Sequence, residues 1–149
     1  MVFTRQELIA ELPHLTAVES PPLEVMELGP EDFESPFSEQ CIRAFRGLKR
    51  DFASGLLFWV KTLQAQGWKG RESYFAGYAE AGLCEPVTEA DFARLVAEYS
   101  GALREPLPPF VRELGGFRFG LRMYADWNDV AVVAELPEAF VAFYWSTTA

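Results

Sequence analysis

The chain has 149 residues, of which 50% are hydrophobic and 15% aromatic, and 22 acidic against 13 basic side chains give a net charge of −9. A chain of this length and apolar content can bury a core without disulfides or metal, and it is too hydrophobic to be disordered. We therefore predict a single folded, acidic domain over residues 1–149.

The first part of the chain, residues 1–34, is predicted to form a short helix and an acidic, proline-containing arm. Thr4 and Glu7 have the spacing of a capping box, and Pro13 is expected to end the helix. Residues 23–28 suit a short edge strand or an extended arm. The amino-terminal residues lack the unbroken apolar core of a signal peptide, so we expect a cytoplasmic protein.

The middle part, residues 35–114, is predicted to be helical. Apolar residues recur at steps of three and four over residues 42–63, which is the spacing of one continuous helical face. A long helix is therefore predicted over residues 36–66, at the centre of the core. Two shorter helices are predicted after it, one over residues 69–81 and one capped by Thr88.

The last part, residues 117–147, is predicted to form strands, because after two glycines the apolar period falls from about 3.6 residues to 2. Three strands with short connections are expected over residues 117–124, 130–136 and 140–147. The predicted fold is α+β: a helical first two thirds, arranged around the long central helix, packs on a C-terminal three-stranded antiparallel meander.

Few residues offer catalytic or metal-binding chemistry. The one histidine, His14, excludes most His-based triads and zinc sites, and Cys41 and Cys84 lack a nearby cysteine partner, so we expect free thiols. Phosphate-binding loops, dinucleotide fingerprints and nucleophile elbows are absent from the sequence. We predict no catalytic residue, no metal and no cofactor, and a non-enzymatic role is preferred while an enzymatic one stays open.

Charge is distributed unevenly along the chain. Residues 1–37 hold eight acidic residues and one basic residue, a net charge of −7. Residues 38–71 hold two acidic and seven basic residues, a net charge of +5, and residues 72–149 hold twelve and five, a net charge of −7. A basic segment is therefore expected between two acidic ones.

A basic face is predicted on the long helix, formed by Arg43, Arg46, Lys49 and Arg50. Three interpretations are open: a solvated face that pairs with the acidic arm, a site for an acidic protein or phosphate group, and a nucleic-acid contact. We do not expect nucleic acid as a direct ligand, because a chain with a net charge of −9 repels a polyanion.

A polar turn, Asp126-Trp127-Asn128-Asp129, separates the first two predicted strands. Core packing does not normally place an indole there, so Trp127, Asp126 and Asp129 are candidate partner-binding residues. Clustered carboxylates also accelerate encounters with basic proteins.

These features predict a non-enzymatic, acidic protein-interaction module, such as an inhibitor, an immunity protein or a regulator that acts on a basic or nucleic-acid-handling protein. The alternative is a domain that binds a small anionic ligand, or a carboxylate-based enzyme, with a pocket between the central helix and the sheet. No membrane association is predicted, because the longest apolar run, residues 56–60, is far shorter than the ~20 residues of a membrane span. The sequence predicts no particular oligomeric state.

Overall fold

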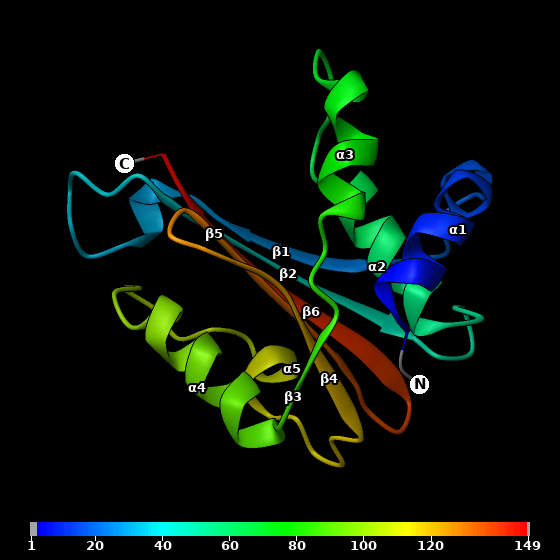
Figure 1. The fold of residues 1–149 in the computed structure, drawn as a ribbon. Helices are drawn as coiled ribbons and strands as arrows, with labels where there is room; N and C mark the ends of the chain where they lie inside the picture. The colour runs from blue at the N-terminus through cyan, green and yellow to red at the C-terminus, as the bar shows by residue number, and fades with distance from the viewer. Residues whose placement is uncertain (1–2, 149) are drawn as a thin grey trace.

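The computed structural model describes residues 3–148 and contains one six-stranded antiparallel sheet with helices on both faces (Figure 1). Met1, Val2 and Ala149, which the predicted domain includes, lie outside the described residues. The strands are β1 (Glu24–Leu28), β2 (Gln40–Leu48), β3 (Glu85–Val87), β4 (Phe119–Asp126), β5 (Asp129–Glu135) and β6 (Ala139–Thr147). They lie side by side in the order β1-β2-β6-β5-β4-β3. The helices are α1 (Arg5–Ala17), α2 (Gly55–Gln64), α3 (Phe75–Glu80), α4 (Glu89–Ser100) and α5 (Pro109–Arg112), with short 3-10 turns η1 (Pro30–Asp32) and η2 (Glu72–Tyr74).

The sheet separates two hydrophobic cores, because successive side chains on a strand point to opposite faces. Helices α1, α2 and α3 cover one face, where Phe58 and Trp59 of α2 belong to the same buried cluster as Phe45 and Tyr144 of the sheet. Helices α4 and α5 cover the other face (Figure 1), where the buried cluster includes Phe143. The protein is thus a sheet between two helical layers.

The long central helix predicted over residues 36–66 is wrong, and so is the sheet of only three strands. Residues 40–48 form β2, which pairs with β1 on one side and with β6 on the other. The helical face predicted over residues 42–63 is therefore divided between β2 and the ten-residue helix α2. Strands β2 and β3 lie in the region, residues 35–114, that was expected to be helical.

Burial on both faces explains why β2 has a helix-like sequence. Ile42 and Ala44 belong to the core beneath α4 and α5, whereas Phe45 belongs to the core beneath α2. A strand buried on both faces carries apolar residues at odd and even positions, so steps of three and four arise without a helix. Helix α2 begins only after a turn, where Ser54 is its N-cap and accepts the backbone N–H of Leu57.

Two helix caps are confirmed. Thr4 caps α1 by accepting the backbone N–H of Glu7 at 3.1 Å, and Thr88 caps α4 by accepting that of Asp91 at 3.1 Å. These predictions succeed because capping depends only on residues three apart. The helix predicted over residues 69–81 is shorter, since it is divided between the turn η2 and the helix α3.

The predicted end of the first helix is wrong, because α1 continues for a further turn with Pro13 inside it. Side chains from α2 stabilise that turn. Gln64 Nε2 donates to the carbonyl oxygen of Thr16 at 3.2 Å, and Lys61 Nζ donates to that of Val18. Tertiary hydrogen bonds thus offset the local cost of the proline.

The C-terminal strands β4, β5 and β6 begin and end within two residues of the predicted bounds and pair antiparallel in chain order. They do not form a separate sheet, since β2 pairs with β6 and β3 pairs with β4. Residues 23–28, for which two conformations were open, contain the edge strand β1. Within residues 3–148, no helix combines the length and the apolar character needed to cross a membrane.

Candidate protein-binding surface

The hairpin between β4 and β5 presents an exposed indole. Asp126 pairs with Asp129 across the last position of the ladder, so Trp127 and Asn128 form a two-residue loop. Trp127 is 72% exposed, whereas the other tryptophans within the described chain are buried or half-buried. Exposed side chains of this size lose water on contact with a partner, and tryptophan is among the commonest residues of binding hot spots.

A second exposed aromatic lies at the same end of the sheet. Phe37, in the loop between β1 and β2, is 89% exposed. The end of β6 joins this loop to the hairpin, because Thr147 N–H donates to the carbonyl of Asn128 and Thr148 N–H to that of Glu39. The loop and the hairpin are seen together at one end of the sheet in Figure 1.

Carboxylates flank the two aromatics in the sequence. The segments 31–39 and 126–129 contain six acidic residues and no lysine or arginine. We name the acidic surface of this end of the sheet, with its two aromatics, the loop-end surface, and it consists of Glu31, Glu34, Phe37, Glu39, Asp126, Trp127 and Asp129. The basic residue Arg104 adjoins this surface, and its Nε donates to the carbonyl of Phe33 at 2.9 Å.

Asp129 differs from the other carboxylates because it is partly buried against α3. The Tyr78 hydroxyl donates to Asp129 Oδ2 at 2.5 Å. Burial raises the pKa of the Asp129 carboxyl, the hydrogen bond from Tyr78 lowers it, and the Asp126 charge raises it further. Burial and the negative charge of Asp129 in turn raise the pKa of Tyr78, which keeps its hydroxyl a donor.

Two aromatic rings pack against Tyr78, one stacked and one tilted. Its ring lies 4.4 Å from that of Tyr124 and 5.5 Å from that of Trp68, measured between centroids. The Tyr124 hydroxyl donates to the backbone carbonyl of Tyr78 at 2.6 Å. These contacts connect the base of the hairpin to α3, so the hairpin projects from a supported position.

The raised pKa of Asp129 predicts a measurable pH dependence of stability. The folded protein holds the Asp129 proton more tightly than the unfolded chain, so this group's contribution is fully present below the ordinary pKa of 3.8. That contribution is lost as pH rises through the raised pKa. Asp129→Asn should therefore remove this decline and be more stable than wild type at neutral pH, as measured by urea unfolding between about pH 3 and pH 7.

Tyr78→Phe provides the control for the Asp129 prediction. Removing the donor leaves the Asp129 carboxylate without its hydrogen bond, so the free energy of unfolding should go on falling to a higher pH than in wild type. At neutral pH it should be lower than that of wild type by about 1–3 kcal/mol. If the free energy of unfolding had the same pH dependence in wild type and Asp129→Asn, ionisation of Asp129 would not destabilise the folded protein.

The predicted basic face does not exist as one surface. Arg43 and Arg46 are an odd number of positions apart on β2, so their side chains lie on opposite faces of the sheet. Each forms an ion pair with a residue of β1: Arg43 Nε lies 3.5 Å from Glu27 Oε1, and Arg46 Nη1 lies 3.5 Å from Glu24 Oε1. These are contacts with the acidic arm, as the first of the three interpretations describes.

Lys49 and Arg50 follow β2 in the turn before α2. Lys49 Nζ forms an ion pair with Glu135 at 2.7 Å and lies 5.7 Å from the centre of the Phe140 ring. Burial and, to a smaller extent, the charge of Arg118 lower the pKa of Lys49, whereas Glu138 raises it. Arg50 is exposed.

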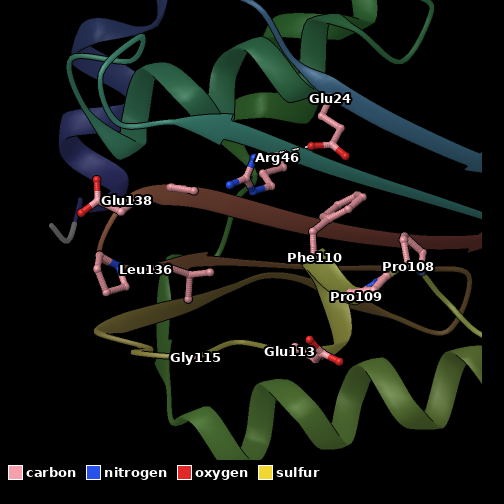
Figure 2. Close-up of a pocket in the computed structure, with 11 residues that line it drawn as sticks. Glu24, Arg46, Pro108, Pro109, Phe110, Glu113, Gly115, Leu136 and Glu138 are labelled. Carbon is pink, nitrogen blue, oxygen red and sulfur yellow. Dashed lines mark ion pairs between the residues drawn. The ribbon is translucent and has the colours of Figure 1, made fainter.

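A cavity of about 630 Å³ adjoins Arg46 on the side of the sheet that α5 covers. Figure 2 shows the Arg46 and Glu24 side chains pointing toward one another near Phe110 of α5. Glu113 and Glu138 also line this cavity, so carboxylates outnumber the one arginine. This cavity lies between the sheet and α5, and not beside a long central helix as expected, because that helix does not form.

Sequence reasoning missed Phe37 of the loop-end surface, and it missed Tyr78, which donates a hydrogen bond to Asp129 of that surface. Phe37 was included in the predicted long helix, and its exposure follows from a loop that the helix prediction excluded. The sequence did not indicate the hydrogen bond of Tyr78, because its partner Asp129 is 51 residues away. A signal for the surface was present in the lack of basic residues over residues 31–39.

Within residues 3–148, no group of three or more histidine, cysteine, aspartate or glutamate side chains is arranged to hold a metal ion. Cys41 and Cys84 are half-buried free thiols, and burial raises the pKa of Cys84 to about 11.

Comparisons of the chain with protein-family models, with curated proteins and with solved structures found no match.

Proposed function

We propose that this protein is a non-enzymatic interaction module that binds a basic protein through the loop-end surface, as an inhibitor, an immunity protein or a regulator. The observation that carries the proposal is the pair of exposed aromatics, Trp127 at 72% and Phe37 at 89%, within a group of carboxylates. A cytoplasmic location is part of this proposal, and a nucleic-acid-handling protein is one such partner.

The charge and the aromatics of this surface have complementary roles. The carboxylates raise the rate of encounter with a positively charged partner, and this effect weakens as salt increases. The two rings supply apolar area at the centre of the contact, where most of the binding energy of an interface is concentrated. The surface therefore suits a partner with an apolar recess inside a basic rim.

The state of Asp129 also supports binding. An asparagine could accept the same hydrogen bond from Tyr78 without the cost of a partly buried charge, yet the chain has an aspartate at this position. A lysine or arginine of a partner, placed beside Asp129, would recover that cost. Stability given up at a surface in this way is typical of functional sites.

The alternative function, a domain for a small anionic ligand or a carboxylate-based enzyme, stays a prediction. The cavity beside Arg46 is the place for such a ligand, but Arg46 is paired with Glu24 and two further glutamates line the walls. An anion there meets more negative than positive charge. No observation favours this function over binding of a basic protein.

The experiment that tests the proposal compares two triple variants of equal net charge. The first neutralises Glu34, Glu39 and Asp126 of the loop-end surface, and the second neutralises three exposed carboxylates elsewhere, Glu11, Glu19 and Glu98. Each immobilised protein is used to capture partners from the cells that produce it. A basic protein should be retained by wild type and by the second variant, and its association rate with the first should fall by about 10-fold.

Salt provides a further readout, because the association rate with wild type should fall as salt rises. Equal weakening by both triple variants would show that overall charge, and not the loop-end surface, attracts the partner. Retention of an acidic protein by wild type, with no effect of either variant, would contradict the proposal.

A further inference from the structure

The edge strand β1 leaves one side of its backbone unpaired within the described chain. β1 pairs with β2 only, and Glu24, Val25 and Glu27 are exposed. In an antiparallel ladder, alternate residues of an edge strand point their N–H and C=O groups outward. The five residues of β1 therefore offer backbone groups that an added strand can use.

Two cavities lie next to each other along β1, on the side of the sheet that α5 covers. The first is the cavity of about 630 Å³ beside Glu24 and Arg46, with Phe110 and Glu113 on its walls (Figure 2). The second, of about 340 Å³, lies beside Met26 and Leu28 and is walled by the segment 103–108. The two cavities share Pro108, so they adjoin, and we call them together the groove along the strand.

The spacing of the cavities matches the repeat of an extended chain. Glu24 and Met26 are two residues apart, which corresponds to about 6.8 Å along a strand. An added strand points every second side chain to this same side of the sheet. One of its side chains therefore meets the cavity at Glu24, and a neighbour two positions away meets the cavity at Met26.

The charge of the groove selects its occupant. Carboxylates on its walls are Glu24, Asp32, Glu105, Glu113 and Glu138, and the basic residues are Arg46 and Arg104. Both arginines are engaged, since Arg46 pairs with Glu24 and Arg104 donates to the Phe33 carbonyl. The cavity at Glu24 has apolar walls and an excess of carboxylates, which suits the long stem and charged end of lysine or arginine.

We propose that an extended basic segment of a partner protein adds to β1 as a further strand, with a basic side chain in the cavity at Glu24 and an apolar one in the cavity at Met26. In the antiparallel arrangement, the partner sequence reads apolar, any residue, basic. A second copy of this chain is a poorer occupant, because it brings its own Glu24 and Glu27 to the edge. The inference adds a second contact to the proposed function and rests on it for the basic character of the partner.

A short peptide tests binding at the β1 edge independently of the loop-end surface. The blocked peptide Ac-TTLTKTT-NH2, titrated to about 5 mM, should shift the backbone amide signals of β1 and of the groove, with a dissociation constant of about 0.1–1 mM. Replacing its lysine by glutamate should weaken binding by about 10-fold. The same peptide with N-methyl groups on alternate residues keeps its charge but cannot pair as a strand, so it should not bind.

Protein variants complete the test. Glu113→Gln should weaken binding of the lysine peptide by about 3-fold, whereas Glu11→Gln on α1 should leave it unchanged. Trp127→Ala should also leave it unchanged, so failure of the peptide experiment and failure of the proposed function are distinguishable. An absence of shifts in β1, or equal binding of the N-methylated peptide, would overturn the inference.

Discussion

Replacing Trp127 with alanine is expected to weaken binding of the basic partner by about 30- to 1000-fold, which corresponds to ~2–4 kcal/mol. The reason is that the indole is 72% exposed at the tip of a two-residue loop, so most of its surface is available to a partner. The same exposure means that truncation removes little from the folded state, and stability should change by less than about 0.5 kcal/mol. Surface plasmon resonance and urea unfolding measure the two effects separately.

The matched control is Ile9→Ala, which also removes an exposed apolar side chain. Ile9 lies on α1 and is 41% exposed. Its truncation should leave the affinity within about 2-fold of wild type. An unchanged affinity for Trp127→Ala, or an equal loss for Ile9→Ala, would show that the partner is not bound through the hairpin.

The features that could be predicted from sequence depend on residues close together in the chain. Thr4 and Thr88 cap helices through N–H groups three residues away, and the short connections at 127–128 and 136–138 set the antiparallel order of β4, β5 and β6. The exposure of Trp127 could be predicted for the same reason, because the side chains of a polar two-residue turn lie at the surface.

The remaining features depend on pairing between distant segments. β2 lies between β1 and β6, and its pairing with β6 joins residues as far apart in the sequence as Gln40 and Thr147. Once this pairing places the end of β6 beside residues 37–39, Phe37 and Trp127 become parts of one surface. No local pattern contains that information, and the apolar steps over residues 42–63 favoured a helix instead.

The close packing of α2 on β2 predicts a large loss of stability for Gly47→Ala. A Cβ at this position would lie 2.5 Å from Phe52 Cε2 and 2.8 Å from Phe58 Cδ1. Neither ring has room to move, because both are buried and Phe58 stacks on Phe140 at 5.5 Å between centroids. The free energy of unfolding should fall by about 2–3 kcal/mol, as expected for overpacking of a filled core. Urea unfolding measures it, with an unchanged m-value expected.

Gly77→Ala on α3 is the matched control, because it makes the same chemical change where a Cβ would meet nothing within 4 Å. Both substitutions restrict the unfolded chain equally, so that effect cancels when the two are compared. Gly77→Ala should raise the free energy of unfolding by about 0.5–1 kcal/mol, because alanine favours the helix over glycine. If Gly47→Ala were equally stabilising, residues 40–48 would not lie against α2, and the loop-end surface that depends on the pairing of β2 with β6 would lose its support.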